Sequence, residues 1–350
     1  MPETTERSLR ERIATSTLLW PVLALIALVA VNLVVHPDFL SLRMQDGELY
    51  GNVIDILRNA APVLLIALGM TLVIATRGID LSVGAVAAIA GAVACVTIDG
   101  SSHESALSTA IIACSLALVT CLVFGLWNGF LVAGLGIQPI IATLVLMTAG
   151  RGIAMLITGG QITLVHNTHF DFLSDGFVLA LPFAILVALA LFALTAIMAR
   201  RTALGMLIEA VGINPEASRL AGVRARTILW TVYAFSGLCA GLAGLMISAN
   251  TSAADANNNG LWIELDAILA VVIGGTALAG GRFSLIGTLI GALFIQTLRT
   301  TVNVIGIPSE MNYLFKAIVV IAVCLLQSPQ ARSLLTVRRR PRLEPKAVAA

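Results

Sequence analysis

The sequence of 350 residues is 58% hydrophobic and only 11% charged, and its formal net charge is +2. Ordinary soluble domains carry about 25% Asp, Glu, Lys and Arg, so this composition excludes a soluble globular protein. It indicates an integral membrane protein in a lipid bilayer, and we expect no nucleic-acid partner.

Apolar runs long enough to cross a bilayer follow one another along the chain. A helix of roughly 17 to 25 apolar residues crosses about 30 Å of hydrocarbon. We therefore predict an all-α, polytopic membrane protein with ten transmembrane helices, at residues 18–35, 60–76, 80–98, 107–133, 138–158, 177–199, 227–249, 266–280, 284–305 and 312–328. These helices form one transmembrane domain (18–328) between a cytoplasmic N-terminal tail (1–17) and a basic cytoplasmic C-terminal tail (329–350).

The distribution of basic residues predicts the orientation. If the N-terminus lies inside, 16 of the 21 Lys and Arg residues fall in inside segments, and the outside loops hold only Arg43 and Arg58. Cytoplasmic loops of membrane proteins carry this excess of positive charge. We expect a multi-pass protein of the bacterial inner membrane with both termini in the cytoplasm. The charged start "TERSLRER" precedes no clear cleavage site, so the first apolar run is expected to remain as a span.

The stretch "ATRGIDLSVG" (75–84) lies between the second and third predicted spans, at an inside turn. Gly78 can supply a tight turn, and Asp80 or Ser82 can cap the following helix. We interpret the stretch as a capped helical hairpin. The alternative is that Arg77 or Asp80 contacts a partner that drives the protein.

Polar side chains inside the next spans are Asn128, Gln138, Thr143 and Arg151. Such groups are costly in lipid, so we expect them to face the interior of the helix bundle. There they either line a path for a solute or join helices by hydrogen bonds. The pairs Gly237/Gly241 and Gly287/Gly291 have the small-x-x-x-small spacing that favours close helix packing in lipid.

The inside loop 200–226 contains signals for a short helix. Asn214 is a good N-cap, Pro215 fits the first helical position, Glu216 suits the positive end of the helix dipole, and Gly222 fits the residue after the helix. Two turns give about 12 Å, which cannot span a bilayer. The small apolar face of Ala217, Leu220 and Ala221 must then pack on the protein's own spans, on lipid or on another protein.

Several stretches in order along the chain carry a family resemblance. They are "GMTLVIATRGIDLSVGAV" (69–86), "GLWNGFLV" (125–132), "IQPIIATLVLMTAGRGIAMLITGGQI" (137–162), "ALGMLIEAVGINPEASRLAGV" (203–223) and "LWIELDAILAVVIGGTALAGGRFSLIGTLIGALF" (261–294). The chain resembles ABC importer permeases of the ribose, galactose and arabinose class. Residues 44–62 and 254–269 are most similar to permeases for galactofuranose.

The resemblance implies a docking role for the short helix. "EASRLAG" (216–222) resembles the cytoplasmic EAA…G loop of these permeases, with Ser218 in place of the second Ala. In that family the helix fits a cleft on the ATPase subunit and transmits its closure to the membrane domain. The residues that this resemblance assigns to coupling are Glu209, Asn214, Pro215, Glu216, Ala217, Leu220 and Gly222.

The resemblance also implies partners: an ABC ATPase subunit, a periplasmic sugar-binding protein, and a second permease copy or a sister chain. A Walker A loop requires G-x-x-x-x-G-K-[ST], and the two lysines, Lys316 and Lys346, stand in no such context. We therefore expect no catalytic residue, metal site or cofactor in this chain, and ATP with Mg²⁺ on the partner ATPase.

The outside loop "DANNNGLWIELDAI" (255–268) offers side chains that can bind hydroxyl groups. Asn257, Glu264 and Asp266 could line a sugar entrance, and Trp262 could stack on a sugar ring. The alternative is an ordinary polar loop whose Trp anchors at the lipid interface. Together with Asn128, Gln138, Thr143 and Arg151, these four residues are the candidates for the solute path.

The alternatives to an ABC permease for a monosaccharide or another small solute are an ion-coupled secondary transporter and a membrane-bound sugar transferase. An ion-coupled secondary transporter needs an ionisable group near mid-membrane, and the predicted span centres contain no carboxylate. A membrane-bound sugar transferase needs paired carboxylates for metal and phosphate chemistry. The inside loops offer only Asp80, Glu209 and Glu216, so the sequence favours a transport subunit without enzymatic activity.

Overall fold

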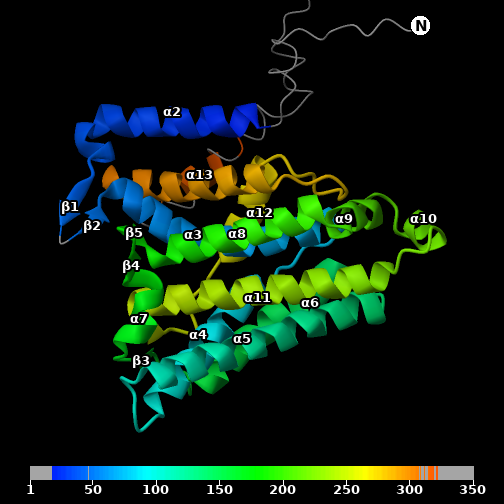
Figure 1. Ribbon diagram of the computed structural model, residues 1–350, viewed down its shortest axis with the longest axis horizontal. Helices are drawn as coiled ribbons and strands as arrows, with labels where there is room; N and C mark the ends of the chain where they lie inside the picture. Colours follow the sequence, from blue (N-terminus) through cyan, green and yellow to red (C-terminus); the bar gives the residue numbers. More distant parts are fainter. Residues whose placement is uncertain are drawn as a thin grey trace, which may run out of the picture.

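The computed structural model describes residues 18–45, 47–306, 308, 311, 314–318 and 321. Long helices run side by side along the longest axis of the molecule, as Figure 1 shows, and the predicted all-α fold is confirmed. They are α2 (Leu19–Val35), α3 (Asn52–Ala75), α4 (Val83–Asp99), α5 (Leu107–Gly129) with its π-helical extension η2 (Phe130–Gly134), α6 (Pro139–Ile157), α8 (Phe183–Arg201), α11 (Ala225–Thr251) and α13 (Leu285–Val304).

Short elements lie at the two ends of this bundle. One end carries α9 (Ala203–Ile213) and α10 (Pro215–Leu220), and we refer to it as the α10 end (Figure 1). The opposite end carries η1 (Pro37–Leu40), α7 (Thr168–Asp175) and three antiparallel strand pairs: β1 (Arg43–Gln45) with β2 (Glu48–Tyr50), β3 (Thr163–Leu164) with β6 (Ala253–Ala254), and β4 (Phe177–Val178) with β5 (Leu181–Pro182). We refer to that end as the hairpin end.

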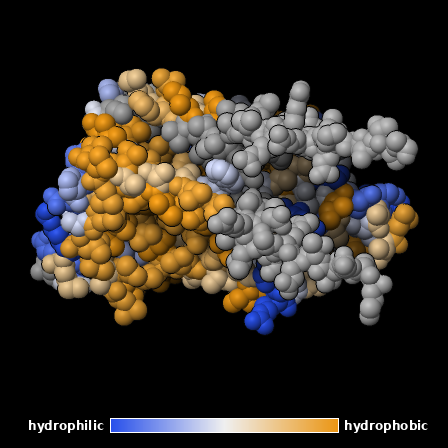
Figure 2. Space-filling model, turned by 90° about the horizontal axis from the view of Figure 1, so that it is seen from above, coloured by the Kyte–Doolittle hydropathy of each residue, from blue (hydrophilic) through white to orange (hydrophobic). Residues whose placement is uncertain are grey.

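The surface and the helix lengths fit a protein that crosses the membrane several times. Six helices in the described part of the chain are long and apolar enough to span a bilayer: α3, α5 with η2, α6, α8, α11 and α13. Figure 2 shows hydrophobic side chains over most of the coloured part of one face, with hydrophilic ones gathered toward its ends. α5, α6 and α8 expose large apolar residues such as Ile111, Leu144 and Leu194, which suits contact with lipid.

Eight of the ten predicted spans correspond to helices, with two shifted boundaries. α3 begins at Asn52 instead of residue 60, because its polar first turns face a cavity rather than lipid. α8 begins at Phe183 instead of residue 177, because residues 177–182 form the β4–β5 hairpin. Leu179 and Ala180 adopt positive φ angles at its turn. The tenth predicted span, 312–328, falls largely outside the described residues.

The eighth predicted span is wrong as a full crossing. It is α12 (Ile263–Ile273), whose 11 residues give a helix of about 16 Å, roughly half the thickness of the hydrocarbon. The helix ends at Gly274, and Gly275 follows with φ of +87°. The chain therefore breaks here and continues irregularly to Ser284 before α13 begins.

The segment 76–82 is not the capped turn at the inner surface that the sequence indicated. Asp80 is 2% exposed, and its Oδ2 accepts a hydrogen bond of 2.8 Å from the Ser236 hydroxyl. Ser236 lies 11 residues into α11, so Asp80 sits about 16 Å from the start of that helix. The segment thus enters the bundle and carries a carboxylate inward, although the centres of the predicted spans contain none.

Two local details of this segment also differ from the prediction. The residue with positive φ is Arg77, at +64°, instead of Gly78. Gly78 is required for another reason, since a Cβ there would lie 2.7 Å from the Tyr233 hydroxyl oxygen. Neither Asp80 nor Ser82 caps α4; Asp80 Oδ1 accepts from the Ser82 backbone N–H and hydroxyl instead.

α11 lies at the centre of the packing, against α3, α4 and α5. The small residues of its α5-facing side allow the two helices to approach closely, as the Gly237/Gly241 spacing predicted. A Cβ at Gly237 would lie 2.6 Å from the Cys121 carbonyl oxygen, and one at Gly241 would lie 2.9 Å from the Cys121 Cβ. Gly287 and Gly291 pack in the same way on Gly274 and Ala270 of the α12 segment.

Replacing Gly237 by valine is expected to lower the free energy of unfolding by about 1–3 kcal/mol, because the added side chain overpacks the contact between α5 and α11. Thermal unfolding of the purified protein in detergent measures the effect. The matched control is Gly152→Val on α6, where an added Cβ meets no atom within 4 Å. Equal midpoints for the two variants would contradict the packing assignment.

Candidate functional site

The short helix predicted in loop 200–226 is confirmed as α10. The Asn214 side chain accepts hydrogen bonds from the backbone N–H groups of Glu216 (3.1 Å) and Ala217 (3.0 Å), and Pro215 occupies the first helical position. Gly222 follows with φ of +85°, the left-handed conformation that favours glycine. The sequence did not predict the helix before it, α9, which brings Glu209 to a half-buried position.

The apolar face of α10 is uncovered in the described part of the chain. Leu220 is 77% exposed, and Ala217 and Ala221 are exposed as well, so the apolar face packs on no described part of the chain. The residue that turns inward is Ser218, whose hydroxyl donates to the Asn214 carbonyl. An apolar face left open beside charged groups is typical of a contact with another protein.

Charged groups next to that face hold each other in place. Arg219 donates to the two carboxylate oxygens of Glu216 at 2.6 and 3.2 Å, one turn away on the same helix. These hydrogen bonds lower the pKa of Glu216 below its ordinary value, so the carboxylate is ionised at neutral pH. α10 therefore presents an ordered ion pair beside Leu220.

The α9–α10 arm (residues 203–220) is anchored to both irregular segments of the bundle. The Arg77 guanidinium donates to the carbonyl of Ile213, the last residue of α9. Gly212 packs so tightly that a Cβ would lie 1.8 Å from the Ala75 carbonyl oxygen, which itself accepts from the Gly281 N–H at 2.8 Å. The arm is thus in direct contact with both breaks, at 76–82 and 274–284.

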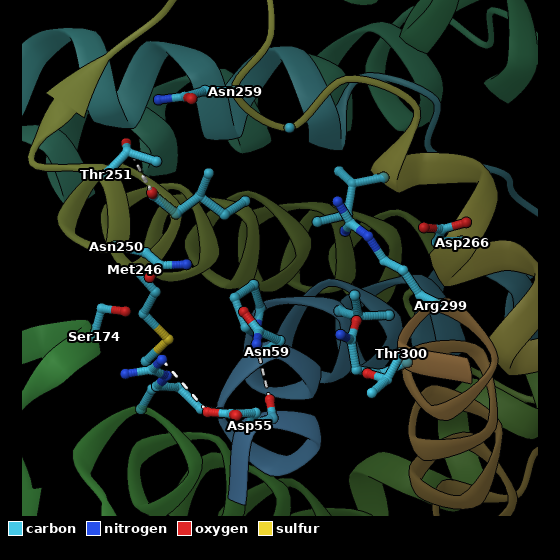
Figure 3. Close-up of a pocket in the computed structure, with 18 of the residues that line it drawn as sticks. Asp55, Asn59, Ser174, Met246, Asn250, Thr251, Asn259, Asp266, Arg299 and Thr300 are labelled. Carbon is cyan, nitrogen blue, oxygen red and sulfur yellow. Dashed lines mark hydrogen bonds and ion pairs between the residues drawn. The ribbon is translucent and has the colours of Figure 1, made fainter. Parts of the chain in front are cut away.

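A polar cavity of about 580 Å³ lies at the hairpin end, between α3, α11, α13 and the segment after β6 (Figure 3). Its polar lining residues come from α3 (Asn52, Asp55, Arg58, Asn59), from α7 (Ser174), from α11 (Asn250, Thr251), from the segment before and at the start of α12 (Asn258, Asn259, Asp266) and from α13 (Gln296, Arg299, Thr300, Asn303). None of the described residues that line it is aromatic. Carboxamides predominate, and each can both donate to and accept from hydroxyl groups.

Three of the four charged lining residues form ion pairs, and Arg299 forms none within 4 Å among the described residues. Arg58 lies 3.6 Å from Asp55 and 3.2 Å from Asp175, and Lys316 lies 2.5 Å from Asp266. Figure 3 shows Asp55 and Asn59 on one side of the cavity, and Asp266 with Arg299 on another. The lining suits a neutral, polyhydroxylated solute better than a highly charged one, because free charge is scarce.

Of the eight candidates for the solute path, Asp266 lines this cavity. Asn257 and Trp262 are exposed in the preceding segment, and Glu264 is buried outside the lining. Asn128 and Thr143 instead attach their helices to the segment 76–82: the Asn128 amide donates to Ser82 at 2.8 Å, and the Thr143 hydroxyl donates to the Ile79 carbonyl at 3.1 Å.

The remaining two candidates differ from each other in their surroundings. Gln138 is exposed at the N-cap of α6, so the expectation that it faces the bundle interior is wrong; α6 begins only at the following residue. Arg151 reaches the segment after β6, where it donates to the carbonyls of Ala256 and Asn259.

Several cavity residues were not predicted from the sequence. Gln296, Arg299, Thr300 and Asn303 lie on one face of α13 at helical spacing (i, i+3, i+4, i+7), a polar stripe in an apolar span. That periodicity was a usable signal. Asn52, Asp55 and Asn59 repeat the same spacing on α3 but fall before the apolar run that marked the span.

Comparisons with known proteins identify relatives over almost the whole chain. The model of a family described as "Branched-chain amino acid transport system / permease component" matches residues 52–324. The galactofuranose transporter permease protein YtfT of Escherichia coli K12 is 49% identical over 341 residues, which cover 96% of each chain. The fructose import permease protein FruF of Bifidobacterium longum is 42% identical, over 97% of this chain and 96% of its own.

A ribose import permease protein, RbsC of Escherichia coli K12, is 36% identical over 87% of this chain and 92% of its own. No solved structure matches the chain significantly.

Proposed function

Because the chain belongs to the family of transport-system permease components that matches residues 52–324, we propose that it is the membrane subunit of an ATP-driven importer for a monosaccharide. The observation that carries the sugar assignment is the 49% identity to a galactofuranose permease over 96% of the chain. Fructose and ribose permeases follow at 42% and 36% identity. Galactofuranose is accordingly the first solute to test.

The proposed partner at the α10 end is an ABC ATPase subunit that binds ATP with Mg²⁺. The exposed face of α10 supports this assignment, since Leu220 and the Glu216–Arg219 pair would fill a cleft on that subunit. The coupling residues are those of the arm and its flanks: Glu209, Asn214, Pro215, Glu216, Ala217, Leu220 and Gly222. The excess of Arg and Lys in the predicted inside segments supports a cytoplasmic location of this end.

At the hairpin end we propose that a periplasmic binding protein delivers the sugar to the cavity. The carboxamides and Asp266 would exchange hydrogen bonds with its hydroxyl groups. The absence of aromatic lining among the described residues favours weak binding, which suits a compartment that a solute must leave again. Movement of the arm, transmitted through the Arg77–Ile213 and Gly212–Ala75 contacts, would open the path toward the α10 end.

The test is a mild-detergent purification of the tagged protein from its native membrane, with the co-purifying chains identified by mass spectrometry and the eluate assayed for ATPase activity. Uptake of labelled galactofuranose is then measured with excess fructose and ribose as competitors. A retained nucleotide-binding subunit and galactofuranose-selective uptake support the proposal. A single chain whose uptake is abolished by a protonophore at normal ATP levels would contradict it and favour ion coupling.

The buried carboxylate of Asp80 does not by itself favour ion coupling. Its two oxygens accept three hydrogen bonds from Ser82 and Ser236, so they are engaged in holding the segment 76–82. A proton or ion carrier needs a group that is free to change partners during transport.

A further inference from the structure

Arg151 is a charged residue within a membrane-spanning helix, the thirteenth of the 19 residues of α6. A guanidinium at this depth is costly unless it has strong partners. It forms no ion pair within 4 Å in the described part of the chain. Instead its Nη1 donates to two backbone carbonyls, those of Ala256 (3.1 Å) and Asn259 (2.6 Å).

Both carbonyls belong to the irregular segment 255–262, which we call the wall loop. Four of its residues, Asn258, Asn259, Gly260 and Leu261, line the cavity. Gly260 and Trp262 have positive φ angles of +66° and +61°, so the backbone here is neither helix nor strand. Irregular backbone inside a membrane domain persists only where other groups satisfy its polar atoms.

Asn259, whose carbonyl accepts from Arg151, also attaches the wall loop to α11 through its side chain. The Asn259 amide donates to the Ser248 hydroxyl of α11 at 3.0 Å and to the Ala253 carbonyl at 3.2 Å. Arg151 binds the carbonyl of the same Asn259, from the α6 side. Asn259 is therefore fixed between two helices, and with it the face that its neighbours present to the cavity.

Glu264, in the first turn of α12, is a second buried ionisable group of this region. It is 3% exposed, and its Oε2 has no hydrogen-bond partner among the described residues. A carboxyl group in this condition is costly to ionise unless a cation lies nearby. Arg151 is the basic residue that attracts it electrostatically, and Asp255 adds to the negative potential around the guanidinium. Gly84 allows the Glu264 carboxyl group to lie against α4, since a Cβ at Gly84 would lie 2.3 Å from Oε2.

We propose that Arg151 is a positioning residue of the transport path: it fixes the wall loop through the carbonyls of Ala256 and Asn259, with Glu264 as its buried countercharge. Arg151 does not line the cavity, so it acts on the solute through Asn258 and Asn259. The role in solute affinity rests on the function proposed above. The role in holding the loop does not.

The loop-holding role is tested without transport. A cysteine is introduced at exposed Asn258 (Asn258→Cys), and its rate of reaction with a membrane-impermeant maleimide is measured on the full-length protein in native membranes. Arg151→Gln, which removes the charge, is expected to change the rate severalfold because the loop is released. Arg151→Lys, which keeps the charge, is expected to fall between Arg151→Gln and the parent.

The matched control is Arg282→Gln, the same substitution at an exposed arginine outside the wall loop, and it should leave the rate unchanged. Should Arg151→Gln fail to insert, Glu264→Gln provides the second variant. It keeps the side-chain shape and removes the countercharge, and it is expected to shift the rate in the same direction. The proposal would be overturned if Arg151→Lys and one of the two neutral variants, Arg151→Gln or Glu264→Gln, reacted at the same rate as the parent Asn258→Cys protein.

The effect on affinity is read from the uptake kinetics. Loss of two hydrogen bonds from a charged donor predicts a rise of about tenfold or more in KM for Arg151→Gln, with Vmax changed less and partial rescue in Arg151→Lys. A fall in Vmax alone would contradict a positioning role at the cavity. If the parent transports no sugar at all, the proposed function fails while the maleimide result still decides whether Arg151 holds the loop.

Discussion

Replacing Leu220 by arginine is expected to remove the ATPase subunit from the purified complex while the permease remains folded. Leu220 is 77% exposed, so the substitution costs little within this chain. In a docked complex it would place a charge in an apolar cleft. Truncation or disruption of such central apolar anchors weakens interfaces by about 2 kcal/mol or more, roughly 30-fold in affinity. Uptake should fall accordingly.

The measurement is the amount of co-purified nucleotide-binding subunit per permease, together with the uptake rate and the thermal midpoint of the purified variant. The matched control is Leu179→Arg, the same change at a leucine that is 90% exposed on the β4–β5 turn at the opposite end. That variant should retain the ATPase subunit. Full retention in Leu220→Arg would show that α10 is not the docking helix.

Glu216→Arg tests the same surface through its charge. The substitution removes the partner of Arg219 and places two positive charges one turn apart near the N-terminal end of α10, where the helix dipole also disfavours them. We expect the variant to insert normally and to uncouple ATP hydrolysis from uptake. Normal uptake would argue against a contribution of this ion pair to docking.

Replacing Asp80 by alanine is expected to destabilise the bundle strongly. It leaves the Ser82 N–H, the Ser82 hydroxyl and the Ser236 hydroxyl without their acceptor, in a site where Asp80 is 2% exposed. Each unsatisfied buried group costs about 1–3 kcal/mol, so three such groups predict a loss of roughly 3 kcal/mol or more in the free energy of unfolding.

Thermal unfolding in detergent, with the yield of inserted protein, measures this effect. Ser236→Ala removes one hydrogen bond and keeps the other two, so it should cost only about 1 kcal/mol. Asp80→Asn retains the acceptor for Ser82 and is expected to lie between the two. An unchanged midpoint for Asp80→Ala would mean that the carboxylate does not hold segment 76–82.

The helices that span the membrane were predictable because lipid imposes a strong and local rule. A crossing segment needs about 20 apolar residues whose backbone groups are satisfied within the segment, and α5, α6, α8 and α11 follow that rule closely. The α10 helix was predictable for a similar reason. Its cap, its proline and its terminal glycine are neighbours in the sequence, so each acts without help from the rest of the fold.

The two broken segments were not predictable in the same way. Residues 266–280 are as apolar as a span. The half-length helix in this stretch packs on α13 through Gly274, Gly287 and Gly291, a contact that the sequence does not indicate. The residues next to Asp80 in the sequence predict that it caps a helix at an inside turn. Its burial depends on Ser236, which is 156 residues away in the chain.

The sequence by itself determined that this is a membrane protein built from helices, where eight of its long apolar runs form helices, and that a short capped helix begins after Asn214. Those features depend on hydropathy and on contacts within a few residues. Tertiary structure alone decided the cavity and the use of Arg151, because their components come from α3, α6, α11 and α13 and from the wall loop. A polar residue in a span must find partners, but which partners it finds depends on how distant helices pack.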